Sequence, residues 1–213
     1  MAGDNDPAAT VYVVDDDPGV LESVRWLLES VDLTVRTFKD PYAFLAAFDD
    51  QGLACLLLDV RMPGMSGLDL QDWLQELGAT VPVVFLTAHG DVPLAVRAMK
   101  SGALEFIEKP YNAQNLIETV QHAIDIHYQK QIAGARRDQL RRLVEGLTPR
   151  EWDVAQLVVD GLSNKAIAAR LGVSPKTVEV HRSRVMAKIG AKSSPELVQL
   201  VYESGSALRG ESS

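Results

Sequence analysis

The sequence predicts two domains of different fold class: a doubly wound α/β domain with a five-stranded parallel sheet, followed by an all-α domain of four helices. Over residues 8–126, short apolar segments alternate with amphipathic ones, which is typical of a parallel sheet covered by helices on both faces. Over residues 147–205, strand patterns are weak and short helical patterns are separated by compact turns. A third observation is an unequal distribution of charge between the two halves, which indicates domains with different partners.

Strands are predicted at residues 11–14, 34–38, 54–58, 83–86 and 104–107, and helices near residues 18–31, 41–50, 67–77 and 92–101, with a fifth from residue 112. Asp17 and Asp40 each precede a proline, which places an N-cap before a residue suited to the first helical position. Gly52, Gly78 and Gly102 suit the ends of helices. These signals divide the first domain into alternating strands and helices.

Residues 127–146 are predicted to be a helical linker that extends the fifth helix. A narrow apolar stripe on it leaves two interpretations open: a solvated linker, or pairing with the linker of another protomer. The stripe consists of Leu140, Leu143, Val144 and Leu147.

The formal net charge of −8 argues, by itself, against nucleic acid as a partner. Residues 1–125 hold 20 acidic and 7 basic side chains, whereas residues 126–213 hold 9 acidic and 14 basic ones. The first half is therefore acidic and the second is basic. The charge of the second half thus favours nucleic acid as a partner, where the charge of the whole chain argued against it.

The composition excludes several classes of protein. Cys55 is the only cysteine, so neither an intrachain disulfide nor a cysteine-rich zinc site is possible, and its apolar neighbours predict a buried core residue. No apolar stretch reaches the roughly 18 residues that a membrane span needs. Residues 1–7 carry two aspartates and no basic side chain, unlike a secretory signal. We expect a cytoplasmic protein with no membrane partner.

Polar residues follow four of the predicted strands. Asp15 and Asp16 follow the first, Asp59 the third, Thr87 the fourth and Lys109 the fifth. Because the carboxyl ends of parallel strands meet at one edge of the sheet, we expect these side chains to lie together. Neighbouring carboxylates repel one another, and Mg²⁺ relieves that repulsion while bridging to phosphate. The pattern predicts a carboxylate that accepts a phosphoryl group, stabilised by Mg²⁺ and Lys109.

Residues 8–126 resemble the receiver domain of two-component response regulators, which has a flavodoxin-like fold. The matching motifs are Val13-Val14-Asp15-Asp16-Asp17, Leu58-Asp59-Val60-Arg61-Met62-Pro63-Gly64-Met65-Ser66-Gly67, Leu86-Thr87-Ala88 and Phe106-Ile107-Glu108-Lys109-Pro110. The resemblance implies that a sensor histidine kinase phosphorylates Asp59, that the domain catalyses only its own phosphotransfer and slow dephosphorylation, and that the Lys109–Pro110 peptide is cis. The implied residue roles are direct Mg²⁺ ligation by Asp16 and Asp59, ligation through water by Asp15 and through its carbonyl by Arg61, phosphoryl contacts by Thr87 and Lys109, and an aromatic switch at Phe106.

The segment 87–103, which includes Thr87-Ala88-His89-Gly90-Asp91-Val92-Pro93, is similar to the FixJ branch of this family. In that branch the face formed by the fourth helix and the fifth strand is a dimer surface, so homodimerisation on phosphorylation is implied. The corresponding residues are Val92, Arg97, Lys100, Ser101, Glu105 and Phe106.

The four helices of the second domain begin at hydroxyl caps. These are Thr148, which forms a capping box with Glu151, and Ser163, Ser174 and Ser194. The third helix has an apolar face with Val178, Val185 and Ile189, and an opposite face with small or polar tips flanked by cations. Such a helix suits the major groove of DNA, although periodicity alone leaves an ordinary helical bundle as an alternative. The short preceding helix and the turn at Gly172 give the spacing of a helix-turn-helix.

Residues 146–205 resemble the LuxR-type helix-turn-helix domain. The matching motifs are Leu147-Thr148-Pro149-Arg150-Glu151, Gly161-Leu162-Ser163-Asn164-Lys165-Ala166-Ile167-Ala168, Leu171-Gly172-Val173-Ser174, Thr177-Val178, His181 and Lys188-Ile189. The resemblance implies binding of double-stranded DNA. Phosphate contacts are implied for Lys165, Thr177, Arg182, Arg184 and Lys188, base contacts for the outer-face residues Glu179, Val180 and Ser183 beside Lys176, and a dimer contact for Leu197, Val198 and Val201 of the fourth helix.

Both motif sets together predict a phosphorylation-dependent, DNA-binding transcription regulator that dimerises, with RNA polymerase as a further partner and activation as the expected outcome. Two alternatives remain. One is a magnesium-dependent phosphohydrolase with an aspartyl nucleophile, suggested by the Asp15-x-Asp17 pattern. The other is a regulator or adaptor in which the receiver is only a docking module. Phosphate incorporation at Asp59 distinguishes the second alternative from the prediction.

Overall fold

The structure is a computed structural model that describes residues 9–50, 52–88 and 92–206. It divides into two compact units, residues 1–130, which we call the α/β unit, and residues 131–213, which we call the helical unit. The segment His89–Asp91 of the FixJ-like motif and most of the tail beyond residue 205 lie outside the described residues.

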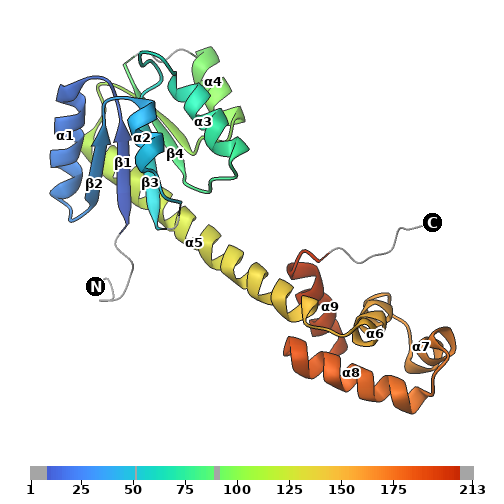
Figure 1. Cartoon of the computed structure of the whole chain (residues 1–213). Helices are drawn as coiled ribbons and strands as arrows, with labels where there is room; N and C mark the ends of the chain where they lie inside the picture. The colour runs from blue at the N-terminus through green and yellow to red at the C-terminus, as the bar shows by residue number, and fades with distance from the viewer. Residues whose placement is uncertain (1–8, 51, 89–91, 207–213) are drawn as a thin grey trace. The chain divides into compact units, whose positions relative to one another are not determined.

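The α/β unit is built on a five-stranded, fully parallel sheet (Figure 1). Its strands are β1 (Thr10–Val14), β2 (Thr34–Phe38), β3 (Ala54–Leu58), β4 (Val83–Thr87) and β5 (Glu105–Glu108). They lie in the order β2-β1-β3-β4-β5, and Val14 of β1 is level with Phe38 and Leu58 of its neighbours. This order confirms the predicted doubly wound fold and puts the reversal of strand order beside β1, where such sheets bind ligands.

Helices cover both faces of this sheet. They are α1 (Pro18–Glu29), α2 (Pro41–Ala47), α3 (Gly67–Glu76), α4 (Val92–Lys100) and α5 (Ala113–Glu145), the last of which continues into the helical unit. One core, around Val11, Val13 and Leu57, includes apolar residues of α1 and α5, and the other, around Tyr12 and Leu56, includes those of α2, α3 and α4. All five residues of β3 and of β4 are buried, as two-sided coverage requires.

In the α/β unit the predicted helix caps are confirmed except at one place. Asp17 accepts a hydrogen bond from the amide of Gly19, Asp40 accepts one from Ala43, and Gly78 and Gly102 both have φ of 73°. The prediction at Gly52 is wrong, because α2 ends at Ala47 and not near residue 50. Phe48 leaves the helix in an extended conformation and packs its ring 5.7 Å from Tyr12 and 5.0 Å from Phe44. Aromatic packing on the core therefore terminates this helix earlier than its pattern predicts.

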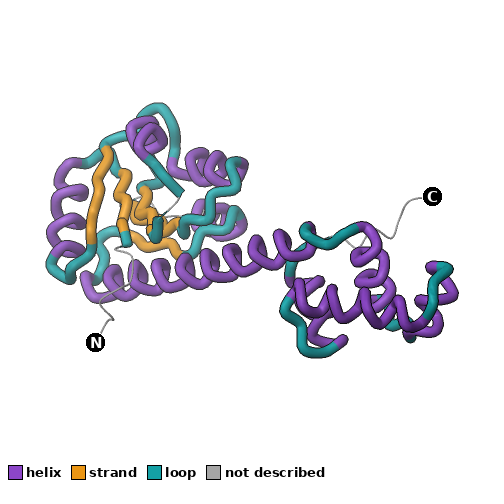
Figure 2. The backbone as a smooth tube through the Cα atoms, turned by 60° about the horizontal axis from the view of Figure 1, so that its bottom comes forward, coloured by secondary structure: helices purple, strands orange, loops and turns teal. Residues whose placement is uncertain are grey.

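The helical unit contains the C-terminal part of α5 and four further helices, α6 (Pro149–Val159), α7 (Asn164–Leu171), α8 (Pro175–Ile189) and α9 (Ser194–Glu203). Figure 2 shows them as short helices joined by compact loops. The capping box of Thr148 and Glu151 and the caps Ser163 and Ser174 are confirmed, whereas α9 is capped by Ser193, one residue earlier than predicted.

Over the predicted linker, the structure is helical as far as Glu145. Its apolar stripe is partly used within the chain, because Leu140 and Val144 are buried and Val144 belongs to the core of the helical unit. Ile132 remains exposed, and pairing with a second linker stays a prediction. Within the described residues, no helix is long and apolar enough to cross a membrane.

Candidate phosphoacceptor site and nucleic-acid interface

Four of the predicted site residues meet at the carboxyl edge of the sheet. Asp15 follows β1, Asp59 follows β3, Thr87 is the last residue of β4, and Lys109 follows β5. Asp15, Asp59 and Thr87 are all buried, and the Lys109 side chain is only 14% exposed. The sheet order places β1 and β3 side by side and β5 beyond β4, so residues separated by up to 94 positions converge here.

Lys109 joins the two carboxylates. Its Nζ lies 2.5 Å from Asp15 Oδ2 and 3.1 Å from Asp59 Oδ1. The adjoining peptide Lys109–Pro110 is cis, as the resemblance implied, and the Lys109 amide donates to the carbonyl of Thr87 at 2.8 Å. The ammonium group therefore partly neutralises two buried anions at one point.

Backbone amides fix the other oxygen of each carboxylate. Asp17 N–H donates to Asp15 Oδ1 at 2.9 Å, and Arg61 N–H donates to Asp59 Oδ2 at 2.7 Å. Both aspartates are thus held by a turn that begins at the residue itself. The arrangement orients the carboxylates before any ligand binds.

Gly67 supports Asp59 in a way that the sequence pattern did not indicate. A Cβ at Gly67 would lie 2.1 Å from the carbonyl oxygen of Asp59, and the Gly67 amide donates to the carbonyl of Val60 at 3.0 Å. Only glycine allows the start of α3 to approach the end of β3 this closely. The pattern contained Gly67 in the matching motif, but nothing in the spacing alone indicated a steric role.

Burial and the neighbouring charges shift the pKa values at this edge. Burial raises the pKa of the Asp15 carboxyl, and the hydrogen bonds from Lys109 and from the Asp17 amide oppose that rise only in part. Burial also acts to lower the pKa of Lys109, but the contacts with Asp15 and Asp59 outweigh it and the net pKa is raised. The lysine therefore stays charged, and it is a fixed cation in a site short of positive charge.

The remaining predicted residues of the site differ in how deeply they are buried. Thr87 is fully buried, whereas Asp16 and Arg61 are exposed. Phe106 is half-buried and its ring lies 6.1 Å from that of Phe85. Among the described residues, no group of three or more His, Cys, Asp or Glu side chains is arranged as a metal site. The structure brings together Asp15 and Asp59 but does not add Asp16 to them.

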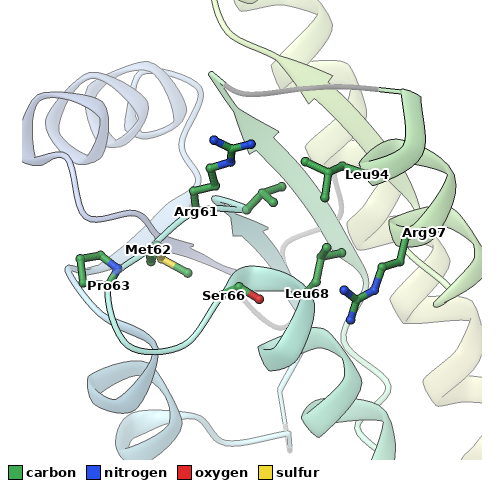
Figure 3. A pocket seen from close by; sticks show the side chains of 8 residues that line it. Arg61, Met62, Pro63, Ser66, Leu68, Leu94 and Arg97 are labelled. Atoms are coloured by element: carbon green, nitrogen blue, oxygen red, sulfur yellow. The ribbon is translucent and has the colours of Figure 1, made fainter.

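A surface groove of about 470 Å³ lies beside this edge, between the segment after β3 and α4 (Figure 3). Figure 3 shows Leu94 and Leu68 facing the groove and Arg97 extending toward Leu68. Arg97 Nη2 lies 3.4 Å from Asp72 and 3.9 Å from Asp69, both on α3. Arg97 therefore ties α4 to α3 in this state. The groove is lined by Val60, Arg61, Met62, Pro63, Ser66, Leu68, Leu94 and Arg97.

The predicted dimer surface of the α/β unit is accessible. Val92 is 75% exposed, and Arg97, Lys100 and Glu105 are also exposed, while Ser101 is half-buried. Carbonyl oxygens near the end of α4 are held from α3, where Gln71 Nε2 donates to Ser101 O at 2.6 Å. An exposed valine among charged side chains at this edge is consistent with a protein contact.

In the helical unit, α8 has the predicted division into two faces. Val178, Val185 and Ile189 are buried in the core, and Val180, on the opposite face, is 43% exposed. Lys176 Nζ lies 3.2 Å from Glu179 Oε2, which holds the glutamate beside a cation. The outer face forms a shallow hollow of about 480 Å³ lined by Lys176, Glu179, Val180, Ser183, Arg184 and Ala187.

Two of the predicted phosphate contacts instead bond within the helical unit. Arg182 donates from Nη1 to Asn164 Oδ1 at 2.7 Å and from Nη2 to Ser194 Oγ at 2.5 Å. Lys188 Nζ lies 2.6 Å from Glu151 Oε2. Lys165 and Arg184 are exposed, and Thr177 is half-buried with its hydroxyl 2.9 Å from that of Ser174. The helical period did not indicate the partners of Arg182 and Lys188.

The predicted apolar dimer surface of α9 is largely wrong. Leu197 and Val201 are each only 1% exposed and belong to the core of the helical unit. Val198 is half-buried. The same apolar pattern that suggested an intermolecular surface is thus consumed by intramolecular packing.

Comparison with known proteins agrees with these two sites. Residues 11–121 match the response regulator receiver domain, and residues 145–201 match the LuxR family of bacterial regulatory proteins. The chain is 44% identical over 195 residues to the transcriptional regulatory protein FixJ of Azorhizobium caulinodans, covering 92% of each chain. It is 41% identical over 201 residues to the regulatory protein TdiR of Thauera aromatica, covering 93% of this chain and 88% of TdiR.

Solved structures give the same result. The response regulator StyR matches with a TM-score of 0.81 and 44% identity, covering 92% of this chain and 99% of StyR. Full-length FixJ from B. japonicum matches with a TM-score of 0.57 and 39% identity, covering 92% and 97%. The chain therefore belongs to the FixJ-like response regulators, transcription regulators that join a receiver domain to a LuxR-type DNA-binding domain.

Proposed function

We propose that a sensor histidine kinase transfers a phosphoryl group to Asp59, and that this modification controls dimerisation and operator binding. The observation that carries the proposal is the position of Lys109 Nζ between the buried carboxylates of Asp15 and Asp59. A cation held there is placed to accept further negative charge on Asp59. The α8 face, on the same chain, supplies the surface that the modification would control.

In the transfer step an oxygen of the Asp59 carboxylate attacks the phosphorus of the donor. The bond from phosphorus to the histidine nitrogen of the kinase breaks, and its electron pair stays on that nitrogen. The product is an acyl phosphate on Asp59. Lys109 would pair with the new anionic oxygens, and the hydroxyl of Thr87 would donate a hydrogen bond to one of them. Slow hydrolysis of the acyl phosphate would reset the protein.

The residues at this edge suit Mg²⁺. The two buried carboxylates carry more negative charge than Lys109 alone neutralises, and Mg²⁺ needs only one or two protein carboxylates because it retains several waters. Asp15, Asp16 and Asp59, with the carbonyl oxygen of Arg61, would hold it. The ion would neutralise charge that develops on the transferred group. Because Asp16 is exposed, it is free to reorient toward the edge.

Phosphorylation would favour one of two conformations of the α/β unit. Movement of Thr87 toward the phosphoryl group would open space for Phe106, which is half-buried beside Phe85. Phe106 is in β5, and Thr87 ends the neighbouring strand β4. The proposed dimer surface lies on α4 and β5, where Val92, Lys100 and Glu105 are exposed. The dimer would present two helical units to paired half-sites, and bound near a promoter it would activate through RNA polymerase.

For DNA we propose that α8 enters the major groove. Glu179, Val180 and Ser183 face the base edges, while Lys165, Lys176, Thr177 and Arg184 contact phosphates on either side. The exposure of these side chains and the hollow that they line support this assignment.

Phosphate incorporation tests the first half of the proposal. Wild-type protein incubated with acetyl phosphate and Mg²⁺ should gain one phosphoryl group per chain, which mass spectrometry detects, and should change from monomer to dimer in light scattering. The variant Asp59→Asn should do neither, and EDTA should abolish incorporation in the wild type. Dimerisation that is unchanged in Asp59→Asn would show that phosphorylation does not control it.

Salt dependence tests the second half. An operator selected from a random duplex library should bind with log affinity that falls by about 0.9 per neutralised phosphate for each unit of log salt concentration. A flat response to salt would contradict the proposed DNA contacts.

A further inference from the structure

We propose that Arg182 is a positioning residue of the helix-turn-helix and not a phosphate contact. Its guanidinium group holds the first residue of α7 and the first residue of α9 against the middle of α8, and so sets the angle at which α8 meets DNA. The inference rests on the proposed DNA-binding function.

The contacts of Arg182 span three helices. Nη1 donates to Asn164 Oδ1 at 2.7 Å, and Nη2 donates to Ser194 Oγ at 2.5 Å. Both contacts are partly buried, and Arg182 itself is half-buried. A guanidinium group is planar and its donors form a rigid fork, so two short contacts on different nitrogens fix its orientation. A lysine at this position could not reproduce that geometry.

Apolar packing alone gives the short helices little to fix their angles. Among the residues of α7 only Ile167 and Ala168 are buried, and among those of α9 only Leu197 and Val201. Helices of eight and ten residues are not stable in isolation, so tertiary contacts determine their orientation. A polar contact that reaches the first turn of both helices adds the directional restraint that the small apolar interface lacks.

Arg182 also differs from Arg184, which lies two residues further along α8. Arg184 is exposed and lines the outer hollow, whereas Arg182 does not line it. Two residues along a helix correspond to a rotation of about 200°, so the two arginines are on different flanks. The chain therefore offers a matched pair of arginines on one helix, one directed to the DNA-facing side and one bonded within the unit.

The salt dependence of binding distinguishes the two roles. We would measure the affinity of the full-length, acetyl-phosphate-treated protein for the selected operator and for a duplex of random sequence, over a range of KCl concentrations. For Arg184→Met we expect both affinities to fall and the salt slope to become shallower by about 0.9. For Arg182→Met we expect an unchanged slope, a fall of about 10-fold or more in operator affinity, equal to the loss of one good base contact, and a change of less than about 3-fold on random DNA.

A double variant keeps the test valid if Arg182→Met fails to fold. Asn164→Ala/Ser194→Ala removes both hydrogen-bond acceptors of Arg182 and leaves the cation in place. A positioning role predicts the same selective loss of operator affinity with an unchanged slope, and Gln199→Ala, an exposed amide on α9, is the control that should bind as the wild type does.

Three results would overturn the inference. They are a slope for Arg182→Met that is shallower by about 0.9 with equal losses on both duplexes, unaltered binding by Arg182→Met, and unaltered or tighter operator binding by the acceptor double variant. Failure of the wild type to bind any duplex with a salt-dependent affinity would instead refute the proposed DNA-binding function, so the two failures are distinguishable.

Discussion

The α/β unit and the helical unit place their charged side chains by different means. In the α/β unit the sheet topology brings Asp15, Asp59 and Lys109 from three strand ends to one buried point. In the helical unit the period of a single helix, α8, spreads Lys176, Arg182, Arg184 and Lys188 around its surface. The first arrangement leaves little choice of partner, whereas the second decides only the direction in which each side chain leaves the helix.

This difference has an energetic consequence. A buried charge without a partner costs several kcal/mol, so the charges at the sheet edge depend strongly on one another. Exposed charges on a helix contribute about 0–1 kcal/mol each and can be exchanged with little effect on folding. Arg182 and Lys188 lie between these limits, since they are partly exposed but bond to other helices.

Removal of Lys109 should give the largest effect. In EDTA, Lys109→Met should destabilise the α/β unit by about 3–5 kcal/mol, because it leaves two buried carboxylates unpaired. Arg184→Met should change the stability of the helical unit by less than about 0.5 kcal/mol. Urea unfolding followed by pulsed hydrogen exchange measures the two units separately, which is necessary because a two-unit chain is not expected to unfold in one step.

The double variant Lys109→Met/Asp15→Asn is the control, and it should recover part of the lost stability because only one buried carboxylate remains. Equal effects of Lys109→Met and Arg184→Met would mean that the sheet edge is solvated like the helix surface, and the distinction between the two units would fail.

A pair of glycines tests steric rather than electrostatic dependence at the same edge. Gly67→Ala should destabilise the α/β unit by about 1–3 kcal/mol or more, since the new Cβ would lie 2.1 Å from the carbonyl oxygen of Asp59. Gly134→Ala in α5, where nothing lies within 4 Å of the new Cβ, should stabilise by about 0.5–1 kcal/mol. Thermal unfolding and phosphate incorporation are the measurements, and incorporation should decrease only in Gly67→Ala. A neutral Gly67→Ala would show that the segment after β3 adjusts without cost.

The same comparison explains how far the sequence could predict the structure. The strands and the convergence of Asp15, Asp59 and Lys109 were predictable, because a parallel sheet leaves few places for residues that follow its strands. The buried face of α8 was predictable from the helical period.

The partners of Arg182 and Lys188 were not predictable, since Asn164, Ser194 and Glu151 lie 12 to 37 residues away and no periodicity relates them. Leu197 and Val201 were misassigned for a related reason, because an apolar residue on a short helix has the same pattern whether its neighbour is its own core or another chain.

His127, in α5, shows the same limit of prediction from sequence. It is the first residue of the predicted linker, yet it is fully buried. Its Nδ1 lies 3.0 Å from both the N and the O atom of Ala54, and its Nε2 lies 3.0 Å from Thr80 Oγ1. Burial lowers the pKa of His127 below its usual value of 6.5; the Ala54 contact and Asp50 oppose that shift, and Lys130 adds to it. The folded α/β unit therefore binds this proton less readily than the unfolded chain does.

The stability of the α/β unit should accordingly be fully present above pH 6.5 and fall as the pH decreases below it, by at most about 1.4 kcal/mol per pH unit for one proton. Hydrogen exchange of β1 and β3 amides between pH 5 and 7.5, corrected for intrinsic exchange rates, measures this. His127→Gln should weaken the dependence on pH, whereas His122→Gln, an exposed histidine of the same helix, should retain it. Identical profiles for the two variants would assign the effect to other groups.

Glu151 provides the corresponding test in the helical unit, and we expect the smallest effect there. The hydrogen bond from Lys188, with those from Thr148, lowers the pKa of Glu151 to about 2 from 4.5. Because the folded-state pKa is depressed, the stability that this carboxylate provides is present above pH 4.5 and is lost as the pH falls toward 2.

Lys188 is 42% exposed, so water and salt weaken the ion pair, unlike the pair at the sheet edge. Circular dichroism melting of the wild type and Glu151→Gln between pH 5 and 2.5 should show converging stabilities at low pH, and 1 M KCl should reduce their difference at pH 5. A difference that persists unchanged at pH 2.5 would mean that the shape of the Glu151 side chain, rather than its charge, ties α6 to the last turn of α8.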